Sequence, residues 1–116
     1  MHRVVLCVFD FAFHFSKQKK MRVEISKSSH PKKKWKAVSG GKTIRFGQTG
    51  YEDFTQHNDP KRRLNYLSRH GSEDWSRSNI MSPAFMSRWV LWEKPSKKAA
   101  LANLNRKYKG VKFTLQ

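Results

Sequence analysis

Cysteine is nearly absent from this sequence, because the chain of 116 residues contains one, Cys7. A single cysteine excludes a disulfide within the chain and any cysteine-rich zinc site. Acidic residues are also scarce, with 8 Asp and Glu against 25 Lys and Arg, so the formal net charge is +17. Such an excess of positive charge repels itself and attracts polyanions. We therefore expect an acidic partner, which is nucleic acid, an anionic membrane face or an acidic protein surface.

A hydrophobic run long enough for a transmembrane helix, which needs about 20 residues, is also missing. The apolar stretch 4–15 is too short, contains Asp10 and His14, and is not followed by the small residues of a signal-peptide cleavage site. Phenylalanine alternates with other residues there, which is the period of a strand. We expect residues 1–20 to form an arm that docks on a partner, unless translation starts at Met21. The docking residues of this arm are expected to be Phe9, Phe11, Phe13 and Phe15.

Aromatic residues, in contrast, make up 13% of the chain, which is enough apolar area for a small core. We therefore expect a single domain over residues 21–116. Short alternating stretches predict its strands, with a hairpin at Ser39-Gly40-Gly41 between the second and third, since glycine adopts positive φ without steric strain. The predicted strands are Met21–Ile25, Trp35–Val38, Thr43–Phe46 and Val111–Leu115.

Three helices are predicted from their starting signals. Asp59 caps and Pro60 begins a first helix, which runs to about His70. We expect Leu64 and Leu67 of this helix to face the core. Ser-Pro at 82–83 and the serine at 96 begin two further helices. Their inward residues are predicted to be Phe85, Trp89 and Trp92 on one, and Ala100, Leu101 and Leu104 on the other.

The order of these elements is β-β-β-α-α-α-β, which is typical of an α+β fold. We expect a small antiparallel sheet of three to four short strands, about three helices, a basic loop and the N-terminal arm. The basic loop surrounds Pro31 and contains aromatic as well as cationic residues, a mixture that suits nucleic-acid binding. The residues expected to bind nucleic acid or an acidic partner are Lys17, Lys19, Lys20, Lys27, Lys32, Lys33, Lys34, Trp35, Lys36, Arg62 and Arg63.

Patterns typical of catalysis or metal binding are missing. The possible ligands have no spacing of a known metal motif, so we expect His57 and His70 to make helix-end hydrogen bonds, and Asp53 and Glu73 to pair with arginines. The hairpin followed by a basic helix is similar to the arrangement in GIY-YIG nucleases, but the tyrosines of that motif are replaced and no helical glutamate is clearly placed. We expect no catalytic residue, metal, cofactor or small-molecule substrate, and a small metal-dependent nuclease is the third alternative.

Residues 41–94 carry the most distinctive motifs of the chain. The motifs are Gly41-Lys42, Phe46-Gly47, Gly50-Tyr51-Glu52-Asp53-Phe54-Thr55, His57, Asp59-Pro60, Arg62-Arg63, Tyr66, Arg69-His70, Glu73, Trp75, Phe85, Ser87-Arg88-Trp89 and Leu91-Trp92. Their order resembles a small uncharacterised basic domain family of nucleocytoplasmic large DNA viruses. The resemblance implies a large DNA virus as the source and a protein that is packaged in the virion. It assigns no catalytic residue.

From charge and resemblance together we expect a non-enzymatic virion structural protein, a minor capsid or capsid-associated component that binds acidic surfaces through a basic face. The expected partners are other capsid proteins, with genomic DNA or the inner membrane surface as further ones. The expected location is the virion, and the host cell cytoplasm during assembly. The alternative is a sequence-nonspecific DNA-binding protein in genome packaging or condensation, which would gather its lysines on one continuous surface.

Overall fold

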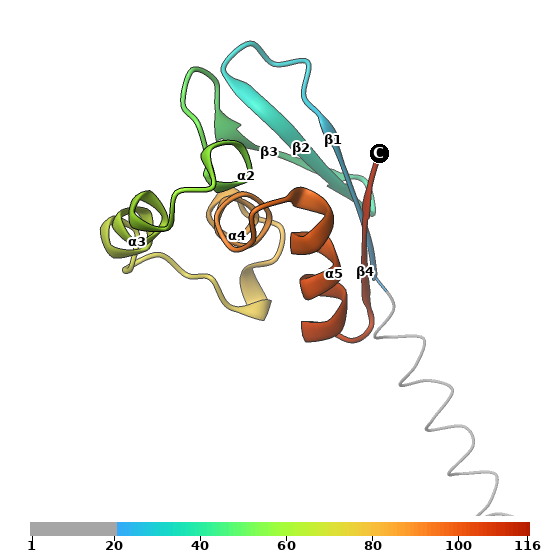
Figure 1. Cartoon of the computed structure of the whole chain (residues 1–116). Helices are drawn as coiled ribbons and strands as arrows, with labels where there is room; N and C mark the ends of the chain where they lie inside the picture. Colours follow the sequence, from blue (N-terminus) through green and yellow to red (C-terminus); the bar gives the residue numbers. More distant parts are fainter. Residues whose placement is uncertain (1–20) are drawn as a thin grey trace, which may run out of the picture.

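The computed structural model describes residues 21–116 (Figure 1). The strands are β1 Met21–Lys27, β2 Lys33–Ser39, β3 Lys42–Gln48 and β4 Val111–Leu115. The helical elements are α2 Phe54–His57, α3 Pro60–Arg69, η1 Arg77–Asn79, α4 Pro83–Met86, η2 Ser87–Leu91 and α5 Lys97–Lys107. The α+β prediction is confirmed. The residues of the predicted arm that lie outside the described part are Phe9, Phe11, Phe13, Phe15, Lys17, Lys19 and Lys20.

The four strands form one sheet in the order β3-β2-β1-β4. The β1–β2 and β2–β3 pairs are antiparallel, as predicted, but β4 pairs with β1 in the parallel direction. The sheet is therefore mixed, and the expectation of a wholly antiparallel sheet is wrong. A parallel neighbour needs a long crossover connection, and the helical elements between β3 and β4 supply it.

The β2–β3 hairpin follows from its two glycines. Ser39 lies opposite Lys42, so Gly40 and Gly41 alone make the turn, with φ of 53° and 82°. Two successive residues with positive φ define the turn type whose twist matches that of the flanking strands. The hairpin predicted from Ser39-Gly40-Gly41 is confirmed.

Only one face of the sheet is covered by the helical layer (Figure 1). The buried strand residues occupy alternate positions, which places them all on this face. They are Val23, Ile25, Ala37, Phe46, Val111 and Phe113. The intervening residues lie on the opposite face, which no other element of residues 21–116 covers.

Helix α3 begins as predicted, because the Asp59 carboxylate accepts hydrogen bonds from the backbone N–H groups of the first turn and Pro60 occupies the first helical position. Its inward face is different from the predicted one. Tyr66 is buried, whereas Leu64 is 62% exposed, and Leu67 is half-buried. The expectation for Leu64 is wrong, because Tyr66, and not Leu64, packs against the rest of the domain.

The second predicted helix is α4 continued by η2, a π-helix. The buried residues lie five apart, as Phe85 with Val90 and Met86 with Leu91, which is the spacing of a π-helical turn. Trp89 and Trp92 are half-buried and pack against this core, and the Trp92 ring also stacks on Tyr66 of α3. The third helix, α5, is confirmed, since the serine at 96 caps it and its inward residues are Ala100, Leu101 and Leu104.

Candidate functional site

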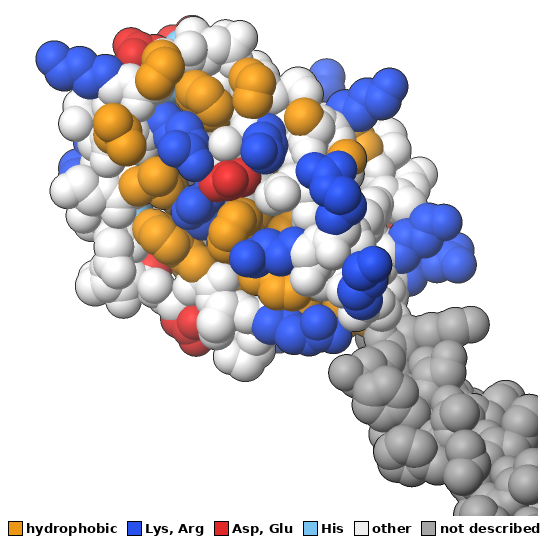
Figure 2. Space-filling view, turned by 60° about the horizontal axis from the view of Figure 1, so that its bottom comes forward, with side chains coloured by type: hydrophobic (Ala, Val, Ile, Leu, Met, Phe, Trp, Pro, Cys, Tyr) orange, Lys and Arg blue, Asp and Glu red, His pale blue; other side chains and the backbone are white. Residues whose placement is uncertain are grey.

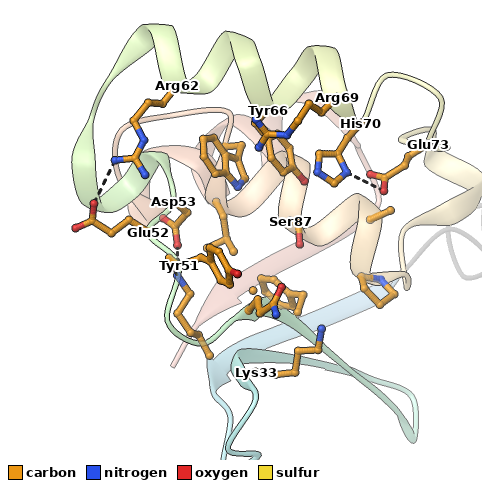
Figure 3. Close-up of a pocket in the computed structure, with 18 of the residues that line it drawn as sticks. Lys33, Tyr51, Glu52, Asp53, Arg62, Tyr66, Arg69, His70, Glu73 and Ser87 are labelled. Atoms are coloured by element: carbon orange, nitrogen blue, oxygen red, sulfur yellow. Dashed lines mark hydrogen bonds and ion pairs between the residues drawn. The ribbon is translucent and has the colours of Figure 1, made fainter.

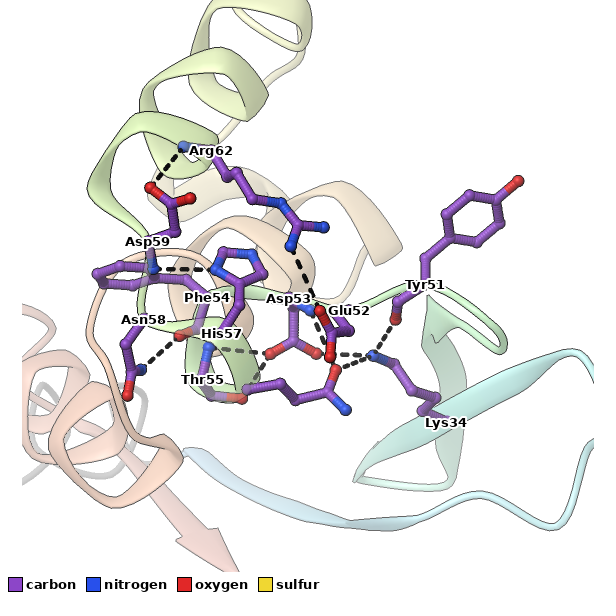
Figure 4. Close-up of polar contacts among 11 residues, drawn as sticks. Lys34, Tyr51, Glu52, Asp53, Phe54, Thr55, His57, Asn58, Asp59 and Arg62 are labelled. Atoms are coloured by element: carbon purple, nitrogen blue, oxygen red, sulfur yellow. Dashed lines mark hydrogen bonds and ion pairs between the residues drawn. The ribbon is translucent and has the colours of Figure 1, made fainter.

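Lys34 connects β2 to α2 (Figure 4). Its Nζ donates to Asp53 Oδ2 at 2.7 Å, to the Tyr51 carbonyl at 2.8 Å and to Gln56 Oε1 at 2.9 Å. Asp53 is buried and also caps α2 by accepting from the Thr55 N–H. Lys34 was expected to bind a partner, but its charge is used inside the domain to neutralise a buried carboxylate.

Arg63 is likewise held by other residues of the domain. Its guanidinium donates to the Trp92 carbonyl and to Glu93, at 2.8 Å each, and Arg88 donates to the same Glu93 oxygen at 2.5 Å. Burial by itself would raise the pKa of the Glu93 carboxyl, but the hydrogen bonds and charges of Arg88 and then Arg63 outweigh it and hold that pKa below its usual value. Arg63 therefore anchors α3 to the segment after η2.

A groove of about 890 Å³ lies between the β2–β3 end of the sheet and α3, with α4 and η2 at its floor (Figure 3). Lys33 lines it from β2, and Arg62 and Arg69 line it from α3. Tyr51, on the segment between β3 and α2, points into it and is 67% exposed. The groove has the volume of a typical small-ligand site.

Carboxylates and a histidine also line the groove, but each is paired. Glu52 pairs with Arg62 at 3.3 Å, and both side chains are exposed. His70 Nδ1 lies 3.0 Å from Glu73 Oε2, whereas Glu73 was expected to pair with an arginine. His57, outside the groove, accepts from the Asp59 N–H, which confirms its predicted helix-end hydrogen bond. Within residues 21–116, no group of three or more His, Cys, Asp or Glu is placed to hold a metal ion.

Aromatic rings form a column along the wall of the groove. The Tyr66 ring stacks on Trp92, with centroids 4.3 Å apart and an interplanar angle of 1°. The His70 ring also stacks on Tyr66, with centroids 4.3 Å apart. Burial, followed by the negative charge of Glu73, raises the pKa of the Tyr66 hydroxyl to about 12. The hydroxyl, which like any tyrosine is protonated at neutral pH, is therefore still harder to ionise here.

Trp35, the tryptophan expected to bind nucleic acid, and two further tryptophans have cations of the protein itself over their rings. Lys97 Nζ lies 4.6 Å from the centroid of the Trp35 ring. The Arg88 guanidinium lies over both Trp75 and Trp89, at 5.1 Å and 4.3 Å. Cation–π contacts of this kind stabilise the fold and occupy the ring faces. Trp35, which is half-buried, is therefore a packing residue in this structure.

The uncovered face of the sheet is basic. Lys36 of β2 lies directly opposite Arg45 of β3, and Arg22 of β1 lies directly opposite Lys112 of β4. Each of these residues is flanked in sequence by side chains that pack on the core, so its own side chain points to the open face. Glu24 of β1 is the one carboxylate among the strand residues of this face within the described chain.

The acidic side chains are used elsewhere in the molecule. Apart from Glu24, each described Asp or Glu accepts a hydrogen bond from a cation, a histidine, a helix N-terminus or, for Asp74, the nearby Ser76. The face in Figure 2 shows many Lys and Arg side chains, interleaved with hydrophobic ones, and few acidic ones. The positive charge is therefore spread over more than one face. Lys27 and Lys32, from the predicted basic set, are exposed near the β1–β2 loop.

Sequence reasoning missed α2 and the groove. Helix α2 had a local signal, because Asp53 and Gln56 have the spacing of a capping box, and both of its hydrogen bonds are present. Tyr51 had no local signal, since its position opposite α3 depends on how α3 packs against the segment after η2. No described helix is long and apolar enough to span a membrane.

Residues 23–70 match the model of a family of unknown function, DUF5754. No curated protein and no solved structure gives a significant match to the chain. The matched segment contains most of β1 and all of β2, β3, α2 and α3, and with them the groove residues Lys33, Tyr51 and Arg69. It ends before α4, which forms the groove floor. This chain is thus similar, over its sheet meander and first helices, to a family to which no activity is assigned.

Proposed function

We propose that this protein is a non-enzymatic binding protein that holds nucleic acid, without reading its sequence, against the open face of its sheet. The observation that carries the proposal is the placement of two cationic pairs there, Lys36 with Arg45 and Arg22 with Lys112. Like charges directly opposite one another destabilise a sheet. Phosphates laid across the face would remove this repulsion and release their counterions, which is the main source of sequence-independent affinity.

The distribution of the remaining charge also favours nucleic acid. The formal net charge is +17, and cations occur on the helical side as well as on the sheet. A protein with cations on several faces can contact more than one nucleic-acid segment, as packaging or condensation requires. Asp53 and Glu93 are paired with cations and Asp59 caps α3, so these carboxylates oppose the approach of phosphate less than free ones would.

A role as a minor capsid or capsid-associated protein of a large DNA virus is a second proposal. It is favoured by the two edge strands, β3 and β4, which have no further strand beside them within residues 21–116. An extended segment of a neighbouring protein could add to such an edge. Mass spectrometry of purified particles tests this role, and absence of the protein from particles would contradict it.

Duplex binding at graded salt tests the main proposal. If the four sheet cations each contact one phosphate, log affinity falls with log salt with a slope of about −3.6, and affinity drops about 150-fold between 50 and 200 mM salt. The variant Lys36→Gln/Arg45→Gln should lower the magnitude of the slope by about 2. Glu24→Gln should strengthen binding, because it removes the carboxylate on this face.

The matched control is Lys61→Gln/Lys98→Gln, which removes the same charge from exposed helical positions. Its slope should change less than that of Lys36→Gln/Arg45→Gln, because these two lysines lie outside the sheet face. Equal loss of slope in both double variants would mean that net charge alone governs binding and that the sheet face has no special role. A parent affinity independent of salt would overturn the proposal.

A further inference from the structure

We propose that the groove between α3 and the sheet holds a single-stranded segment of nucleic acid, one base of which stacks on Tyr51. The inference rests on the proposed function, and adds which form of nucleic acid binds and where. Tyr51 is 67% exposed, and it lies between Lys33 of β2 and the α3 arginines (Figure 3). Among the aromatic residues of the described chain, its ring is the most exposed.

The backbone of Tyr51 is fixed although its ring is free. Its carbonyl accepts from Lys34 Nζ at 2.8 Å, and its N–H donates to the Gln48 carbonyl at 3.4 Å. Lys34 is itself anchored to the buried Asp53 (Figure 4). The ring is therefore presented from a rigid base, which reduces the entropy lost when a base stacks on it. Stacking on aromatic side chains is tolerant of base identity.

Two cations in the groove have no acidic partner within the described residues, Lys33 on the sheet side and Arg69 on the α3 side. Arg62 and Arg69 are seven residues apart on α3, which places them on one face about 10 Å apart along the axis. Arg69 can therefore contact a phosphate at one end of this face, while Arg62 at the other end is shared with Glu52. Of the carboxylates nearby, Glu52 is paired with Arg62, and Glu73 is hydrogen-bonded to His70.

A single strand fits this site better than a duplex. Tyr51 can stack only on a base with a free face, and bases inside a duplex are stacked on both faces. The column of Trp92, Tyr66 and His70 gives the groove an apolar wall beside the cations. A positively charged groove with an exposed aromatic ring is the arrangement that sequence-independent single-strand binding uses.

The test is fluorescence anisotropy with a labelled 12-nucleotide thymidine oligomer and a 12-base-pair duplex. Tyr51→Ala should weaken oligomer binding about 5- to 150-fold and leave duplex binding unchanged, because it removes one stacked base. Tyr51→Phe, which keeps the ring, should bind as the parent does. Leu64→Ala is the matched control, since it removes an exposed apolar side chain outside the groove. Arg69→Gln should lower the magnitude of the oligomer salt slope by about 0.7 and leave the duplex slope unchanged.

The outcomes separate this inference from the proposed function. If Tyr51→Ala and Arg69→Gln bind the oligomer as the parent does, while Lys36→Gln/Arg45→Gln weakens binding, the groove inference is overturned and the sheet-face proposal stands. If the parent binds neither nucleic acid, both are overturned. If adenosine monophosphate at 1 mM or below displaces the oligomer, the groove takes a free nucleotide and the single-strand inference is overturned.

Discussion

Replacing Lys34 by alanine should remove a large fraction of the protein's unfolding free energy, because the ammonium group neutralises a buried carboxylate. Asp53 is 3% exposed, and Lys34 Nζ lies 2.7 Å from its Oδ2. Removing one partner of a buried ion pair costs about 3–5 kcal/mol. Asp53 keeps the hydrogen bonds from Thr55, and the Lys34 side chain is 20% exposed, so we expect a loss near the lower end, about 3 kcal/mol.

Urea and thermal denaturation of the purified full chain measure this loss. A loss of about 3 kcal/mol should lower the midpoint of thermal unfolding by roughly 12–24 °C in a domain of this size. The neighbour Lys33 has no ion pair in the described chain, so Lys33→Ala should change stability by less than about 0.5 kcal/mol. The double variant Lys34→Met/Asp53→Asn should recover much of the loss, because it leaves no buried charge.

The opposite result would refute this reasoning. If Lys34→Ala unfolds at the same temperature as the parent and binds nucleic acid more weakly, Lys34 is a binding residue, as its place in the basic run suggested. If the double variant is no more stable than Lys34→Ala, the loss does not come from the unpaired carboxylate.

Three further predictions concern the packing around the groove. Gly47→Ala should destabilise the protein more than Gly50→Ala. The two glycines have similar positive φ values of 79° and 93°, but only at Gly47 would an added Cβ lie 2.9 Å from Leu91 Cδ1. Equal unfolding free energies of the two variants would contradict the clash. Trp92→Ala should lower the unfolding free energy by about 3 kcal/mol, since the ring stacks on Tyr66. The exposed Leu64 is the control, and Leu64→Ala should change it by less than about 0.5 kcal/mol. Similar melting temperatures of the two variants would place Trp92 outside the core. The pKa of Glu93 is lowered in the folded state, so its contribution to stability is present above the unfolded pKa of about 4.3 and is lost as the pH falls through the lower folded pKa. Glu93→Gln should therefore lose less stability on acidification than the parent. Parallel curves of unfolding free energy against pH for the two proteins would refute the pairing with Arg88.

Local signals explain why most elements could be predicted from the sequence. The cap and proline at Asp59-Pro60, the serine at 96 and the glycine pair of the β2–β3 hairpin act within a few residues of themselves. Alternation of apolar residues likewise identified the strands. These features need no knowledge of the remaining chain, and the structure confirms them.

Features that depend on distant residues were predicted wrongly or missed. The core face of α3 contains Tyr66 and not Leu64, because the Trp92 ring stacks on that tyrosine. Trp92 directly follows the π-helix η2, whose wide turn sets the direction of the residues after Leu91 and is not predicted by a period of 3.6 residues. The parallel direction of β4 is set by the path of the chain through the helical layer, which no local pattern encodes.

For binding, the sequence by itself determined the sign of the charge and therefore the kind of partner to expect. Only the tertiary structure decided which cations are available, since ion pairs form between residues far apart in sequence. Lys34 and Arg63 are held inside by Asp53 and Glu93, whereas Lys36 and Arg45 meet across two strands on the open face. The physical reason is that the charge of a side chain is fixed by its chemistry, but its freedom to meet a ligand is fixed by the neighbours that folding gives it.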